Sequence, residues 1–204
     1  MLFRSRKEVP DALIAEFRRA MDTYAVAVIR HDGPFTDEQH VGFTRRLGPL
    51  QKMKMLTMVG NSTSRLAYPE LIDVGNLDVD GKLLPDDDRR RAYNRGNLLW
   101  HTDVSFDANR ATLSLLAAHR IPPVGADTEF ADTRAAYDAL PEAIKKRIEG
   151  LVVEHSVWHS RALGGMSDVS EAEKATRPPS HHRLVHRSEE HTSELQSQST
   201  ISYA

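Results

Sequence analysis

The chain has 204 residues, of which 40% are hydrophobic, and this is enough for one ordinary domain. It contains no cysteine, which excludes disulfides and thiolate metal ligands and leaves His and carboxylate side chains as the strong ligands. The formal charge is −2 with basic residues spread along the chain, so the composition indicates no nucleic-acid partner. No apolar run approaches the roughly 18 residues of a membrane span, and we expect a cytoplasmic protein with no membrane partner.

The N-terminal third predicts a helix, a strand and a second helix. Apolar residues at helical spacing follow Pro10 and continue to Tyr24, which indicates an amphipathic helix with one buried stripe. The short apolar run 25–29 predicts a core strand. Thr36 and Gln39 form the pattern of a capping box, which predicts the start of a helix that Gly48 ends. These features all indicate core packing.

Three stretches before residue 97 are less regular. Residues 52–64 begin with alternating Lys and Met, which fits a half-exposed strand or a flexible loop. A Lys there could meet an anionic substrate, but we favour a solvated loop. Residues 71–74 predict a short strand. The run of three Asp and three Arg at 86–91 predicts a mobile solvated loop rather than a binding patch.

Residues 97–106 (NLLWHTDVSF) hold a candidate metal site. Apolar and β-branched residues predict an extended strand, in which positions two apart share a face, so His101 and Asp103 can approach one point. A non-haem Fe(II) oxygenase holds its metal with two His and one carboxylate. With ten His in the chain, about one His-x-Asp triplet is expected by chance, so the spacing alone is a weak signal.

The following residues predict alternating strands and helices. Residues 111–115 alternate as a half-buried strand does, and Thr128 begins a further strand after a Pro/Gly turn. Asp132 or Thr133 caps a helix, a second helix runs from Pro141 to Gly150, and a strand follows at 151–157. His155 and His159 in or after this strand fit structural roles better than metal ligation. Residues 164–180 predict a long polar surface loop.

Two phrases, WHTDVSF at 100–106 and GADTEF at 125–130, stand in the order found in one family. Together they resemble the taurine dioxygenase / 2,4-dichlorophenoxyacetate dioxygenase family of Fe(II)/2-oxoglutarate-dependent dioxygenases. The likeness runs from about residue 23 to residue 186. It implies a mostly β fold with flanking helices, a double-stranded β-helix (jelly roll), which would be incomplete in this chain. It also implies that His101 and Asp103 bind Fe(II), that Thr128 binds 2-oxoglutarate, and that Asn97 lies near the substrate.

The resemblance implies a reaction in which O₂ and the cosubstrate 2-oxoglutarate hydroxylate a small organic anion, with release of succinate and CO₂. The substrate would be of the aryloxyalkanoate or alkylsulfonate type, and the residues around His101 and His155 favour the aryloxyalkanoate side. No catalytic residue beyond the metal ligands is implied. The resemblance leaves open whether the full-length enzyme forms a homo-oligomer.

The chain divides into residues 1–186, the N-terminal portion of a jelly-roll domain, and residues 187–204. The string RSEEHTSELQS at 187–197 resembles the translation of a common sequencing adapter, so we expect a non-native, disordered tail. The family places its second iron His and its 2-oxoglutarate-binding Arg after residue 186. We therefore expect the present chain to be inactive. The alternatives are a non-catalytic metal-binding jelly roll and a non-functional fragment.

Overall fold

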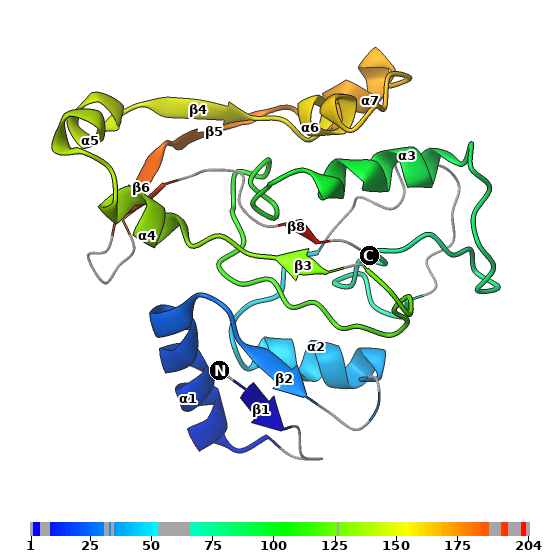
Figure 1. The fold of residues 1–204 in the computed structure, drawn as a ribbon. Coiled ribbons are helices and arrows are strands. Elements are labelled where there is room, and N and C mark those ends of the chain that lie inside the picture. Colours follow the sequence, from blue (N-terminus) through cyan, green and yellow to red (C-terminus); the bar gives the residue numbers. More distant parts are fainter. Residues whose placement is uncertain are drawn as a thin grey trace. The chain divides into compact units, whose positions relative to one another are not determined.

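The computed structural model describes residues 2–4, 9–30, 33, 35–52, 66–125, 127–187, 193–195 and 201–202. The chain forms two compact units (Figure 1). Unit 1 holds Met1–Thr57, Asn61–Asp73 and Leu115–Pro123, and unit 2 holds the remainder, Met58–Gly60, Val74–Ser114 and Val124–Ala204. None of the helices in the described ranges is both long and apolar enough to cross a membrane. The predicted loop or strand at 52–64 lies almost entirely outside the described residues.

Unit 1 begins with the predicted order of elements. The helix α1 (Asp11–Tyr24) ends where Ala25 adopts a left-handed conformation with φ of 59°. The strand β2 (Val28–Arg30) therefore starts later than predicted, and it pairs in parallel with β1 (Leu2–Arg4). The helix α2 (Asp37–Arg45) has the predicted capping box, in which the Thr36 side chain accepts from the Gln39 backbone N–H.

The core of unit 1 lies between its two helices. The rings of Phe17 and Phe43 pack edge to face with centroids 5.8 Å apart. Burial of apolar stripes supplies most of the free energy that holds such helices together. The other buried residues of this core are Ile14, Ala20, Val41 and Leu47.

Unit 2 contains short helices and strands. Its helical elements are α3 (Arg89–Arg95), the 3-10 helix η2 (Gly96–Leu98), α4 (Thr133–Asp138), α5 (Glu142–Ile148), α6 (Val157–Leu163) and α7 (Glu171–Thr176). Its strands are β3 (Thr128–Glu129), β4 (Val152–His155), β5 (Ser180–Arg183), β6 (Val185–Arg187), β7 (Ser193–Leu195) and β8 (Ile201–Ser202). The antiparallel pairs are β4 with β5, β6 with β7, and β3 with β8.

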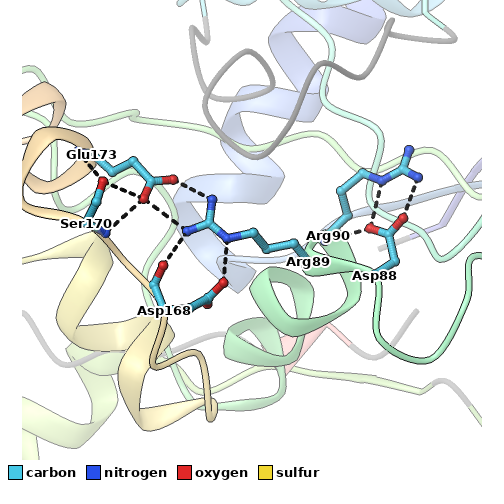
Figure 2. Close-up of polar contacts among 6 residues, drawn as sticks. All are labelled: Asp88, Arg89, Arg90, Asp168, Ser170 and Glu173. Atoms are coloured by element: carbon cyan, nitrogen blue, oxygen red, sulfur yellow. Dashed lines mark hydrogen bonds and ion pairs between the residues drawn. The ribbon is translucent and has the colours of Figure 1, made fainter.

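The loops predicted at 86–91 and 164–180 are partly helical, so these two predictions are wrong. Asp88 caps α3 by accepting from the Arg90 backbone N–H at 2.8 Å, and Ser170 with Glu173 forms a capping box at α7. Arg89 then joins the two helices, because it donates to the Asp168 carboxylate at 2.9 Å and to the Glu173 carboxylate at 3.0 Å (Figure 2). We call Arg89, Asp168 and Glu173 the Arg89 clamp.

The strands of the described residues form four separate two-stranded sheets. These pairs do not by themselves form a double-stranded β-helix, so the complete jelly roll stays a prediction. The strand predicted at 71–74 is absent from the described structure. Burial alternates along 111–115 as predicted, but these residues join no sheet. Residues 187–204 contain β7 and β8, and the expectation of a disordered, non-native tail stays a prediction.

Candidate metal and anion site

The candidate metal pair lies in an irregular segment, and the strand predicted for 97–106 is wrong. Residues 96–98 form η2, and residues 103–106 form a turn in which the Asp107 backbone N–H donates to the Val104 carbonyl at 3.1 Å. Val104 has φ of 57°, a left-handed conformation that is strained for a β-branched residue. Residues 99–102 lie between η2 and this turn and belong to neither.

His101 and Asp103 nevertheless lie together. The Nε2 atom of His101 is 3.2 Å from Oδ1 of Asp103. The Nδ1 atom of His101 is 2.7 Å from the Leu99 carbonyl oxygen, and since a carbonyl only accepts, Nδ1 carries the donated proton. This second hydrogen bond orients the ring and leaves Nε2 as the atom available to a metal ion.

The spacing of the two ligand atoms fits a shared metal ion. Two donors that are each about 2.1 Å from a metal and at right angles to each other lie about 3 Å apart. The distance of 3.2 Å between Nε2 and Oδ1 agrees with this geometry. The His101 side chain is 17% exposed and the Asp103 side chain 48%, so the pair is open to solvent mainly from the carboxylate.

The two side chains stabilise each other's charge. Burial acts to lower the pKa of His101, but the hydrogen bonds to Asp103 and the Leu99 carbonyl outweigh it, and the pKa is raised. The hydrogen bond from His101 lowers the pKa of Asp103 against the effect of burial, and the Ser114 hydroxyl contributes in the same direction. A metal ion would replace the Nε2 proton that Asp103 now accepts.

Asn97 lies on η2 and accepts a hydrogen bond at its Oδ1 atom from Nη1 of Arg161, at 2.9 Å. The Arg161 charge also acts on His101 and Asp103, lowering the pKa of both groups as a lesser influence. The sequence did not single out Arg161, because nothing in the helix signal of α6 shows that this charged residue is buried.

Thr128 is half-buried at the start of β3. No hydrogen bond among the described residues joins Thr128 to His101 or Asp103. The strand β8 pairs with β3 and also contacts η2, so it lies next to both elements that carry Thr128 and Asn97. The role of Thr128 toward 2-oxoglutarate therefore stays a prediction.

A second group of histidines lies on the β4 and β5 strands and the adjoining β6. The rings of His155 and His182 have centroids 5.6 Å apart, and those of His182 and His186 are 6.3 Å apart. Burial lowers the pKa of both His155 and His186, and the nearby Arg110 charge acts in the same direction. Within the described ranges, no three His, Asp or Glu side chains are arranged to hold a metal ion.

Comparison with known proteins places this site in a family. The family model described as "Taurine catabolism dioxygenase TauD, TfdA family" matches residues 3–203, and the chain belongs to this family. It is 41% identical over 180 residues to the alpha-ketoglutarate-dependent 2,4-dichlorophenoxyacetate dioxygenase of Cupriavidus pinatubonensis, with 88% of this chain and 62% of that protein covered. It is 32% identical over 169 residues to the (S)-phenoxypropionate/alpha-ketoglutarate-dioxygenase of Sphingobium herbicidovorans, with 81% and 53% covered.

The fold is also that of a solved relative. The crystal structure of AAD-2 in complex with Mn(II) and N-oxalylglycine has a TM-score of 0.86 and 40% sequence identity, over 93% of this chain and 65% of that one. The chain thus spans between 53% and 65% of the length of these relatives.

Proposed function

We propose that the chain is the metal-binding portion of an Fe(II)- and 2-oxoglutarate-dependent dioxygenase that hydroxylates a small organic anion and releases succinate and CO₂. The observation that carries this proposal is the 3.2 Å approach of Nε2 of His101 and Oδ1 of Asp103, with His101 oriented by the Leu99 carbonyl. The whole-length protein would have the double-stranded β-helix fold.

Each candidate residue has a role that its chemistry supports. His101 and Asp103 would bind Fe(II), which when bound supplies the chemistry of O₂ activation. Thr128 would donate its hydroxyl to a carboxylate of 2-oxoglutarate, and this donation satisfies an anion without adding a competing charge. Asn97 would contact the substrate. The third iron ligand and the Arg that binds 2-oxoglutarate would come from beyond the matched motifs.

Relatives favour an aryloxyalkanoate over an alkylsulfonate. The 2,4-dichlorophenoxyacetate relative of Cupriavidus pinatubonensis and the phenoxypropionate relative of Sphingobium herbicidovorans each align over more than 80% of this chain. The relative named as a putative sulfonate dioxygenase, from Schizosaccharomyces pombe, aligns over 33%. The bound N-oxalylglycine of AAD-2 is an analogue of 2-oxoglutarate and supports the cosubstrate. The cytoplasmic location and a homo-oligomer of the full-length enzyme stay predictions.

Sequencing the source DNA past the codon for His186 is the first test. A His codon followed at a short distance by an Arg codon would support the dioxygenase. A continuous reading frame with neither would favour the alternative, a non-catalytic metal-binding jelly roll. Adapter sequence in place of genomic DNA would show that the present polypeptide is a fragment.

Turnover is the second test. The completed chain should convert 2-oxoglutarate to succinate only with Fe(II), and the His101→Ala variant should abolish this conversion. The 204-residue chain should bind Fe(II) weakly and show no turnover, because two ligands hold a divalent ion loosely. Iron-dependent succinate formation by the 204-residue chain would refute its inactivity, and its absence in the completed chain would refute the dioxygenase.

A further inference from the structure

Arg161 occupies a space that two glycines make for it. Arg161 is 8% exposed, and it lies on α6, where its side chain contacts the start of η2. A Cβ atom at Gly96 would be 2.2 Å from Nη1 of Arg161, and a Cβ atom at Gly164 would be 2.7 Å from the Gly96 backbone nitrogen. The close approach of α6 and η2 therefore requires glycine at position 164, where a Cβ atom would meet backbone, and a side chain at position 96 would displace the Arg161 guanidinium.

The guanidinium is held by uncharged partners. Its Cζ atom lies 4.2 Å from the centroid of the Tyr93 ring, and its Nη1 atom donates to Oδ1 of Asn97 at 2.9 Å. In the part of the chain that the structure describes, no carboxylate forms an ion pair with Arg161. The Arg161 charge acts on the Asp103 carboxylate without an ion pair, and the Nε atom of Arg161 is buried with no hydrogen-bond partner among the described residues, so the guanidinium can still attract a further anion.

The hydrogen bond also determines which way Asn97 faces. A guanidinium has five N–H donors and no acceptor, so the atom of Asn97 that faces Arg161 must be the amide oxygen. The Nδ2 atom of Asn97, with two N–H donors, then faces away from Arg161. Asn97 can therefore offer two N–H donors to an oxygen acceptor.

We propose that Arg161 is a positioning residue, which holds Asn97 as an N–H donor and supplies a fixed positive charge beside His101 and Asp103. This arrangement selects a substrate that carries a carboxylate over an uncharged analogue of the same shape. The inference rests on the proposed function and assigns substrate-anion selection to residues of this portion of the chain. The geometry that carries this arrangement is the hydrogen bond from Arg161 to Asn97, which lies four residues before His101, and the Arg161 charge also acts on both members of the pair.

The test follows the side-chain amide signal of Asn97 by NMR in the ¹⁵N-labelled 204-residue chain. The probes are phenoxyacetate and the uncharged 2-phenoxyethanol, and the Asn97→Asp variant assigns the signal. Phenoxyacetate should shift this signal with saturation, and 2-phenoxyethanol should not. Arg161→Gln should weaken the phenoxyacetate response about tenfold, and Arg161→Lys should restore part of it.

The Asn97→Asp variant controls for a loss of binding that is caused by failure to fold. Its carboxylate still accepts from Arg161 but has no N–H donor, so it should keep the thermal stability of the parent. The overall chemical shift changes caused by phenoxyacetate should nevertheless weaken about tenfold. Arg89→Gln is the matched control, because it removes another arginine of unit 2 that lies in the Arg89 clamp, and it should leave the phenoxyacetate response unchanged.

Three results would overturn the proposal: no saturable response to phenoxyacetate, an equal response to 2-phenoxyethanol, or an unchanged response in Arg161→Gln and Asn97→Asp. The titration needs neither metal nor turnover. Loss of turnover in the completed chain with an Arg161-dependent response would therefore refute the proposed function alone. Turnover with no such response would refute this inference alone.

Discussion

The Arg89 clamp and the His101–Asp103 pair both join a cationic side chain to a carboxylate in unit 2, and they differ in how fully they are satisfied. Arg89 donates to two carboxylates and to the Asp168 carbonyl, and Glu173 also accepts from the Ser170 backbone N–H at 2.9 Å (Figure 2). His101 and Asp103 share a single 3.2 Å contact, and the carboxylate is 48% exposed.

This difference separates a structural ion pair from the pair that we propose as a metal site. The clamp joins α3 to residues 79 and 84 positions away in sequence, so its bonds hold the unit together. The His101–Asp103 pair joins residues two apart and adds little to the tertiary structure. It keeps acceptor capacity on Asp103, and Nε2 of His101 could bind a metal ion once the ion displaces its proton.

The largest effect should come from breaking the clamp. Arg89→Ala should lower the free energy of unfolding by about 2 kcal/mol, because Glu173 loses charge-assisted hydrogen bonds that are partly shielded from water and Asp168 loses exposed ones. Urea denaturation measures this loss. Lys174→Ala, which removes an exposed pair with Glu171, is the control and should change stability by about 0.3 kcal/mol. Equal losses in the two variants would show that the clamp is no stronger than a surface pair.

Metal affinity should depend on the other pair. His101→Ala should weaken Mn(II) binding at least about tenfold, as measured by the free-ion signal in electron paramagnetic resonance. Arg89→Lys, which disturbs only the clamp, should leave the Mn(II) affinity unchanged. A similar loss in both variants would indicate that the metal binds elsewhere or that the clamp supports the site.

Acid should weaken the clamp. The hydrogen bond from Arg89 lowers the pKa of Glu173 from 4.5 to about 2. A carboxyl whose pKa is lower in the folded state stabilises the fold above its unfolded pKa, and this stability is lost as pH falls from about 4.5 towards 2. Because the Glu173 side chain is 22% exposed and screened by solvent, we expect a loss of about 1 kcal/mol. Stability measured over this range should be flatter in Glu173→Gln, and an equally steep curve would contradict the assignment.

The smallest effect concerns the backbone next to Asp103. Val104→Asn should raise the free energy of unfolding by about 0.5 kcal/mol, because Asn tolerates the left-handed conformation that Val adopts at φ of 57°. Urea denaturation is again the measurement, with Val157→Asn, at a buried helical position, as a destabilised control. A destabilised Val104→Asn variant would show that the Val side chain contributes more by packing than it costs in strain.

Local signals in the sequence predicted the elements that local contacts hold. The capping box of Thr36 and Gln39 and the cap of Asp132 lie within three residues of the groups that they bind, and both helices form as predicted. The same kind of signal was present at Asp88 and at Ser170 with Glu173, but the charge and polarity of their surroundings favoured loops. The loop prediction failed because the partners of Arg89, Asp168 and Glu173, are remote in sequence. Their bonds to Arg89 stabilise a packed helix where the local charges favoured a loop.

His101 and Asp103 were predicted correctly to lie together and wrongly to lie on a strand, and their role as metal ligands stays a prediction. Two residues apart, His101 and Asp103 can meet in several backbone conformations, and here a turn with a strained Val104 brings them to 3.2 Å. The apolar and β-branched residues around them predicted a strand, but no partner strand among the described residues pairs with this segment. A strand depends on its neighbour for hydrogen bonds, and that neighbour is not encoded locally.

The sequence by itself determined the family, the capping of several helices, and the two side chains that would share a metal ion, because each depends on residues within one or two turns of chain. Only the tertiary structure decided that Arg89 closes a clamp on α7 and that Arg161, 64 residues after Asn97, orients its amide. Contacts between residues far apart in sequence depend on the tertiary path of the chain between them. A buried charged residue has no local sequence pattern that distinguishes it from a solvated one.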